Sequence, residues 1–277
     1  MKIIHYNEIV ILENLKPDDN SARKLYGDLI HYRGKDGKFD LLYEKFESLE
    51  DLKRKLTSIK EKMKSDRRFP ILHFEVHGSI NGLVLNSEER ITWEEMNNEL
   101  VKINIAARCN LIVAMGVCFG GRIDFNAIIR AVSENGRSPY FGLLGSQREM
   151  YNDEIYEDFF AFYKALLNGA SFEEAFEHVT GSLELYSSEK NIDTLVREAK
   201  KDFGSPNFNA ICVEALDNWL KQGQDPLPGK PYKEKLEKVK EFQQLRSLNK
   251  LKAIRERFLM IDLFPEEGKL FKKFEDI

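Results

Sequence analysis

Two long apolar segments, each closed by glycine, constrain the fold of this chain more than any other feature. Residues 70–78 read PILHFEVHG, and residues 110–121 read NLIVAMGVCFGG. Each segment predicts a strand that ends at a reactive side chain, His77 in the first and Cys118 in the second. Ligands of open α/β sheets bind beyond the carboxyl ends of the strands. If the two strands are parallel neighbours, His77 and Cys118 meet at that edge of the sheet.

Patterns typical of strands and helices alternate along most of the chain. Strands are predicted at 3–12, 39–47 and 140–145, and helices at 21–31, from Ser48 to about Met63, at 92–108 and at 123–135. Two more helices follow, separated by Asn168-Gly169. Strands that alternate with helices imply βαβ units with right-handed crossovers. We therefore expect an α/β fold, with a mostly parallel sheet flanked by helices.

Local signals place some helix and turn boundaries. Capping boxes, in which Ser or Thr is followed three residues later by Glu, predict helix starts at Thr92 with Glu95 and at Ser171 with Glu174. A hairpin is predicted around Asn81-Gly82. The apolar segment 208–213 is compatible with a last strand or with the start of a helix, and we favour the strand, in which Cys212 would pack.

The character of the sequence changes after residue 224. Residues 225–231 hold three prolines and a glycine, which indicate a linker or a sharp turn. Residues 233–258 then carry apolar residues at about three-residue steps and predict an amphipathic helix. The segment 258–265 is strongly apolar for a terminus, so we expect it to dock on the body or on a partner. The predicted domains are a body at 1–224 and a helical C-terminal extension at 225–277.

Composition excludes several classes of function. The chain has 277 residues, 42% of them hydrophobic, and its net charge of −4 argues against nucleic acid as the main ligand. No apolar run approaches the ~20 residues of a membrane-spanning helix, and no secretory leader is evident, so a cytoplasmic location is expected. The three cysteines, Cys109, Cys118 and Cys212, lack the spacing of a disulfide framework or a structural zinc site.

The pair of strands ending in His-Gly and Cys-x-Gly-Gly resembles the caspase-like (clan CD) cysteine peptidases, in particular the bacterial CHAT-type branch. The resemblance covers roughly residues 1–215. Further segments that fit it are 8–14 (EIVILEN), 82–85 (GLVL), 91–95 (ITWEE), 159–169 (FFAFYKALLNG) and 171–175 (SFEEA). It implies a caspase-like fold and a cysteine endopeptidase. CHAT-type relatives often serve bacterial antiviral defence or regulated proteolysis, so the resemblance implies a protein substrate.

The sequence also departs from the caspase pattern. The caspase signature is Gln-Ala-Cys-x-Gly, with histidine ~50 residues upstream of the cysteine. Here the cysteine turn reads Gly116-Val117-Cys118-Phe119-Gly120, and His77 is 41 residues upstream (118 − 77). The Gln before the cysteine and the Arg that can follow it in the caspase signature are both missing, which argues against a caspase-type preference for cleavage after aspartate. Gly116 also stands where metacaspase-like enzymes carry an acidic specificity residue.

The resemblance assigns a role to each reactive residue. Cys118 is the expected nucleophile, although a cysteine at the end of a strand is often only a small buried hydrophobe. Gly120-Gly121 and the helix that follows favour a thiolate at this turn. His77 is the expected proton shuttle. The backbone N–H groups of Gly78 and Cys118 would form the oxyanion hole.

Acidic residues near the predicted site have less certain roles. Glu75 shares a face of its strand with His73 and His77, and we expect it to bind substrate or to form an ion pair near the site. A metal site there is disfavoured, because His73 and His77 would lie ~13 Å apart on one strand. Asp153 follows the strand after the cysteine turn and is a candidate for substrate binding, although a solvated surface position is an alternative. We expect no metal and no cofactor.

Two other functions stay open at this point. The first is a catalytically silent scaffold with the same fold, in which Cys118 is unreactive. The second is an acyltransferase, in which an amine rather than water resolves the acyl-enzyme. The expected partners are a protein substrate and a regulatory protein that binds residues 225–277, with no membrane and no nucleic acid.

Overall fold

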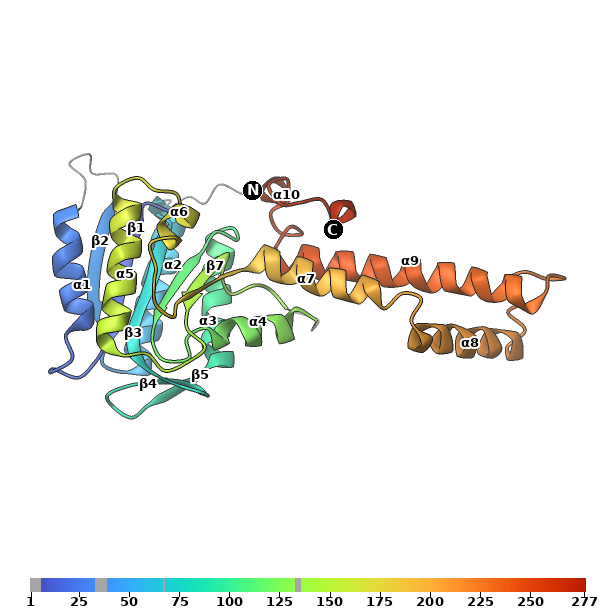
Figure 1. Cartoon of the computed structure of the whole chain (residues 1–277), viewed down its shortest axis with the longest axis horizontal. Helices are drawn as coiled ribbons and strands as arrows, with labels where there is room; N and C mark the ends of the chain where they lie inside the picture. Colours follow the sequence, from blue (N-terminus) through green and yellow to red (C-terminus); the bar gives the residue numbers. More distant parts are fainter. Residues whose placement is uncertain (1–5, 33–38, 67, 133–135) are drawn as a thin grey trace.

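The computed structural model describes residues 6–32, 39–66, 68–132 and 136–277. Its body is an eight-stranded, mostly parallel sheet with helices on both faces (Figure 1). The main strand order is β2-β1-β3-β6-β7-β8, and only β8 runs antiparallel to its neighbour in this row. The strands are β1 (Glu8–Asn14), β2 (Asp40–Lys45), β3 (Pro70–Ser79), β4 (Gly82–Val84), β5 (Arg90–Thr92), β6 (Ile112–Gly116), β7 (Gly142–Gly145) and β8 (Glu184–Ser187). The expected α/β class is therefore confirmed.

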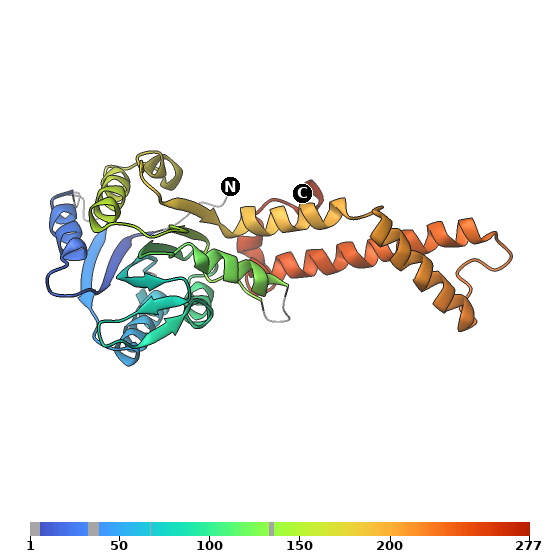
Figure 2. The same cartoon turned by 60° about the horizontal axis from the view of Figure 1, so that its bottom comes forward.

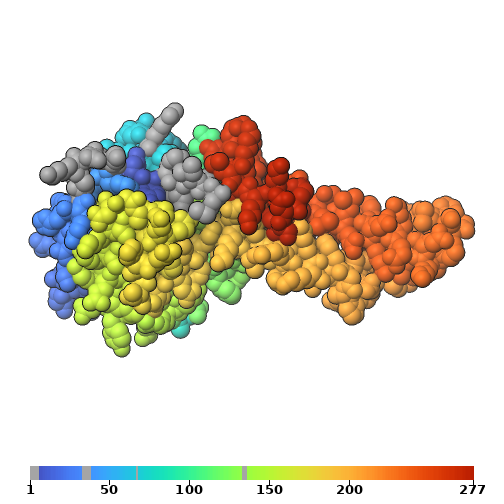
Figure 3. Space-filling model, turned by 45° about the horizontal axis from the view of Figure 1, so that its top comes forward, coloured from blue at the N-terminus to red at the C-terminus, as the bar shows by residue number. Residues whose placement is uncertain are grey.

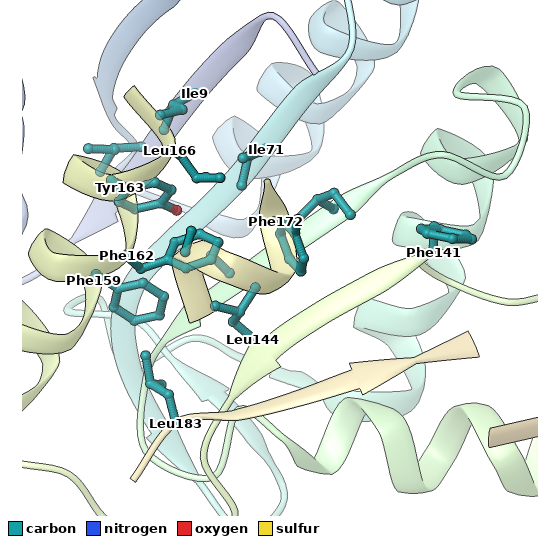
Figure 4. Packing of buried hydrophobic residues seen from close by; sticks show 14 of the residues in the cluster. Ile9, Ile71, Phe141, Leu144, Phe159, Phe162, Tyr163, Leu166, Phe172 and Leu183 are labelled. Carbon is teal, nitrogen blue, oxygen red and sulfur yellow. The ribbon is translucent and has the colours of Figure 1, made fainter. Parts of the chain in front are cut away.

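Alternating side chains of the central strands build two separate cores. On β1, Ile9 and Ile11 face one cluster of buried side chains, whereas Val10 and Leu12 face the other. The first cluster is covered by α1 (Ser21–Leu29), α5 (Asn152–Leu167) and α6 (Phe172–Phe176), and Figure 4 shows the aromatic side chains of α5 in it. The second is covered by α2 (Leu49–Asp66) and α3 (Trp93–Ala106). Burial on both faces fixes β1, β3 and β6 as the central strands.

The local signals in the sequence locate these elements well. Both predicted capping boxes are present, because Thr92 caps α3 with Glu95 and Ser171 caps α6 with Glu174. The predicted hairpin is formed by β3 and β4, joined by a two-residue turn, and β5 extends it. The helix after the cysteine turn, α4, spans Arg122–Ala131. Of the strand predicted at 3–12, residues 3–5 lie outside the described residues.

The strand prediction at 208–213 is wrong. This segment belongs to α8 (Pro206–Lys221), whose start is capped by the Ser205 hydroxyl, which accepts a hydrogen bond from the Phe208 N–H over 3.1 Å. Pro206 at the first helical turn suits a helix start as well. Cys212 is accordingly buried in a helix. The last strand of the sheet is β8, which the sequence analysis did not predict.

Helices α7 (Ser188–Lys201), α8 and α9 (Tyr232–Phe258) form an arm that projects from the body (Figures 1 and 2). Helices α8 and α9 pack together through Cys212, Leu216 and Val239. The boundary expected at 224/225 falls in the turn between these two helices, within the arm. The helix predicted at 233–258 is present as α9, but its apolar residues do not share one buried face, because Val239 is buried whereas Phe242 and Leu245 are exposed.

The C-terminal segment returns to the body, as Figure 3 shows. It contains α10 (Pro265–Gly268) and a 3₁₀ turn (Phe274–Asp276), and another 3₁₀ turn (Ile30–Tyr32) follows α1. Phe258, Met260 and Phe271 are buried in the first core. The end of the chain therefore docks on the body. None of the helices in the described ranges is long and apolar enough to cross a membrane.

Candidate functional site

The ends of β3 and β6 bring His77 and Cys118 to one edge of the sheet. These strands are parallel neighbours, in register from Ile71 opposite Ile112 to Glu75 opposite Gly116. Beyond the paired region, the backbone of Gly78 lies against the backbone of Cys118. A Cβ atom at Gly78 would be only 2.0 Å from the Cys118 carbonyl oxygen. The condition that the two strands be parallel neighbours is met.

The two reactive side chains differ in their surroundings. His77 is exposed to solvent, whereas Cys118 is half-buried. The Cys118 Sγ accepts a hydrogen bond from the Met150 N–H over 3.4 Å, and it lies 3.6 Å from the Met150 carbonyl oxygen. The thiol is thus engaged by the backbone of the loop between β7 and α5 rather than by His77.

The turn after Cys118 has a constrained backbone. Phe119 has a φ of 61°, in the left-handed region that non-glycine residues seldom adopt. At Gly120, a Cβ atom would lie 2.5 Å from the Met115 Cβ, so a larger residue would not fit. The Phe119 N–H donates to the Arg148 carbonyl over 3.0 Å, and the Gly121 N–H donates to the Ser146 carbonyl over 2.8 Å. Loop 146–150 therefore holds the cysteine turn in place.

The electrostatic setting of this turn favours negative charge. Within the part of the chain that the structure describes, the Cys118 N–H donates no backbone hydrogen bond, so it can bind an oxyanion. Cys118 also lies four residues before the start of α4, and the N-terminal end of a helix dipole carries partial positive charge. The Arg122 guanidinium, 5.9 Å from the centre of the Phe119 ring, adds a full positive charge beside the turn.

Glu75 lies in a buried polar network beneath the site. Its Oε1 is 3.0 Å from His73 Nε2, and its Oε2 accepts a hydrogen bond from the Ser21 hydroxyl over 2.9 Å. His73 Nδ1 is 2.9 Å from the Tyr163 hydroxyl. Only 1% of Glu75 is exposed, and a Cβ atom at Gly116 would lie 3.1 Å from its carboxyl carbon. Glu75 is therefore held by His73 and Ser21 inside the body, and it does not line the surface.

Asp153 lies in a different environment. It is exposed in the first turn of α5, three residues after Met150. The ion pair at this corner joins Arg148 to Glu154. Across the described residues, no group of three or more His, Cys, Asp or Glu side chains is arranged to hold a metal ion.

Several residues of this site were not found by sequence reasoning. Met150 contacts the thiol through its backbone, so its side-chain type carries no signal. Ser21 and Tyr163 reach Glu75 and His73 from α1 and α5, far away in the sequence. The spacing of His73, Glu75 and His77 indicated that they share a face of the strand. It did not indicate which helices pack on that face.

Comparison with known proteins adds no assignment, because no protein-family model matches the chain and no curated protein is similar to it. The geometry itself provides a thiol at a strongly bent turn, an exposed imidazole on the neighbouring strand and an unbonded N–H beside the thiol. These are the parts that acyl transfer through a thioester requires.

Proposed function

We propose that this protein is a cysteine endopeptidase of the caspase-like class, with Cys118 as nucleophile and His77 as proton shuttle. The observation that carries the proposal is the close approach of Gly78 to Cys118, which sets His77 and the thiol on adjacent strand ends. The mostly parallel sheet flanked by helices is compatible with that class.

The reaction proceeds in two steps at this site. The Cys118 sulfur attacks the scissile carbonyl, and His77, having taken the thiol proton, donates it to the leaving amine as the C–N bond breaks. The carbonyl oxygen becomes an oxyanion in the tetrahedral intermediate and binds the N–H groups of Gly78 and Cys118. Water, deprotonated by His77, then attacks the thioester and releases the new carboxylate and the free thiol.

Loop 146–150 takes part in admitting the substrate. In this conformation the Met150 backbone contacts the thiol on both its donor and its acceptor side. Substrate binding exchanges these contacts for contacts to the scissile carbonyl and to His77. Asp153, exposed just beyond the loop, is available to a substrate side chain, whereas the buried Glu75 is not.

The substrate is a protein segment bound in an extended conformation along the sheet edge, a common mode for such sites. The resemblance to CHAT-type peptidases suggests a role in bacterial defence or regulated proteolysis within the cytoplasm. A regulatory protein would bind the arm, where large apolar side chains are exposed on α8 and α9. Among them are Ile211, Phe242 and Leu245, which are 55%, 48% and 59% exposed.

The proposal is tested by labelling with peptidyl acyloxymethyl ketones that vary in the residue before the scissile bond. We expect wild-type protein to be labelled at Cys118, Cys118→Ala to be unlabelled and His77→Ala to be labelled at least about 100-fold more slowly. Cys109→Ala and Cys212→Ala are matched controls, because both thiols are fully buried. Labelling of His77→Ala at the wild-type rate would contradict the dyad.

The same experiment separates the two other functions. A scaffold would show no labelling of Cys118 with any probe, although an arm with exposed apolar side chains would still bind its partner. An acyltransferase would form the thioester but transfer the acyl group to an added amine faster than to water. We favour hydrolysis, because the exposed His77 edge admits water.

A further inference from the structure

Helix α4 carries a stripe of large apolar side chains that face solvent. Phe125, Ile129 and Val132 are 60%, 55% and 58% exposed. At 3.6 residues per turn, these three positions and Arg122 fall within an arc of about 80°. The buried residues of the helix lie on the opposite side, at Ile123, Ala127 and Ala131. Large apolar side chains that are clustered in this way mark an interaction surface, whereas scattered ones need no explanation.

A groove runs beside this stripe, between α4 and α7, and part of α9 also lines it. Figures 1 and 2 both show α4 and α7 running in the same general direction at the root of the arm. At the start of the groove the Asn191 side chain donates a hydrogen bond to Asp124. The far end is therefore lined by Val132 and Asp202. Apolar side chains from both helices lie between the two ends, at Ile128 and Leu195.

Charge is distributed unevenly between the two ends of the groove. Arg122, the first residue of α4, and Lys190, in the first turn of α7, lie at the start. Asp124, also at the start, is already hydrogen-bonded inside the protein. Glu198 and Asp202 lie at the far end. This surface thus has a positive end and a negative end.

One charge at each end lacks a partner within the chain. Among the described residues, Arg122 forms no ion pair, and its Nε atom is buried without a hydrogen-bond partner; its guanidinium lies beside the Phe119 ring. Asp202 is exposed and also forms no ion pair in the described part of the chain, whereas Glu198 is paired with Lys201 over 2.6 Å. A partly buried arginine without a carboxylate is stabilised by an anion from outside the chain.

We propose that α4 is the contact surface of a two-fold symmetric dimer, in which the stripe of each copy lies in the groove of the other. In a two-fold contact both copies present the same surface, so a stripe beside a groove complements itself. Antiparallel α4 helices bring Arg122 of each copy to Asp202 of the other, and Phe125 of each copy to Ile129 of the other. A parallel pair would place the two Arg122 side chains together, so charge selects the antiparallel pair.

The test is sedimentation of the full chain over about 1–100 µM, which covers micromolar association. We expect wild-type protein to form a dimer with a dissociation constant in this range. Ile129→Glu buries one unpaired charge from each copy in the contact, so it should weaken association at least about 100-fold. Leu245→Glu is the matched control, because Leu245 is 59% exposed but lies on α9 in the arm. It should change the dissociation constant by less than about twofold.

Two charge reversals test the antiparallel register. Arg122→Glu and Asp202→Arg should each weaken association at least about 10-fold, because each creates like-charge contacts at both ends of the interface. The double variant restores the pair with its charges exchanged, so its dissociation constant should return to within about fivefold of wild type. Circular dichroism at low concentration checks that each variant is folded. Labelling of Cys118 is not the readout, because Arg122 lies beside the cysteine turn.

Three results would overturn the proposal. A wild-type protein that stays monomeric at about 100 µM would leave the stripe to a different partner. A dimer that survives Ile129→Glu, or that Leu245→Glu also dissociates, would place the contact elsewhere. A double variant that associates no better than the single reversals would reject the antiparallel register. Because none of these results depends on peptide cleavage, the dimer and the proposed peptidase are tested separately.

Discussion

Gly78→Ala tests the close contact between the two strand ends most directly. The added Cβ would lie 2.0 Å from the Cys118 carbonyl oxygen, and ordinary contact begins at 3.4 Å, so one backbone must move by about 1.4 Å. Neither atom belongs to a flexible side chain. Overpacking of this kind costs about 1–3 kcal/mol, and a displacement of ~1 Å at a reacting group costs about 100-fold in rate.

We therefore expect Gly78→Ala to lower the melting temperature by roughly 2–12 °C, since each kcal/mol corresponds to about 2–4 °C in a chain of this size. Cys118 labelling should slow by about 100-fold or more. The matched control is Gly27→Ala, in the last turn of α1, where a Cβ atom meets nothing within 4 Å. The free energy of unfolding of that variant should rise by about 0.5–1 kcal/mol, because alanine has a higher helix propensity than glycine.

The measurements are thermal unfolding by circular dichroism and the rate of labelling by a single ketone probe. If Gly78→Ala unfolds and is labelled like wild type, the two strand ends do not meet as described. If Gly78→Ala is less stable but is labelled at the wild-type rate, the contact stabilises the fold but does not matter for the reactivity of Cys118.

Three further predictions concern the attachment of the arm and the C-terminal segment. Arg255→Met should lower stability by about 3–5 kcal/mol in urea unfolding, because it leaves buried Asp193, bonded over 2.6 Å, without its cation. Arg137 lowers the pKa of Asp262, so this pair stabilises the fold above the ordinary Asp range and the stabilisation is lost as pH falls through the lowered pKa. Because the pair is partly exposed, Asp262→Asn should lower the free energy of unfolding by only about 0.5 kcal/mol at pH 7, and should leave it unchanged near pH 2. Urea unfolding at both pH values checks this, and an equal loss of stability at the two would contradict it. Truncation after Gln224 should yield insoluble protein, because it uncovers the first core; a soluble, labelled product would show that the C-terminal segment is dispensable.

Much of the body could be predicted from the sequence because its signals are local. The apolar runs of β3 and β6 and the capping boxes at Thr92 and Ser171 each depend on a few neighbouring residues. The relation between His77 and Cys118 followed from one topological rule, that the carboxyl ends of parallel neighbours meet.

The remaining features depend on contacts that the sequence does not show. A six-residue apolar run at 208–213 suits a strand or a buried helix equally, and the cap at Ser205 decided the outcome. Strand β8 has no apolar run, since it is an edge strand and partly exposed. The Met150 contact with the thiol is made by backbone atoms. Ser21, the partner of Glu75, lies 54 residues before it, and Tyr163, the partner of His73, lies 90 residues after it (75 − 21 and 163 − 73).

The arm is joined to the body at both ends without slack. Helix α7 begins at Ser188, directly after β8 ends at Ser187, and α9 ends in buried Phe258. With 27 residues, α9 is about 40 Å long. The arm begins at the end of β8, the neighbour of β7, and the loop that leaves β7 touches the thiol. Two adjacent strands therefore separate the root of the arm from the reactive edge of the sheet.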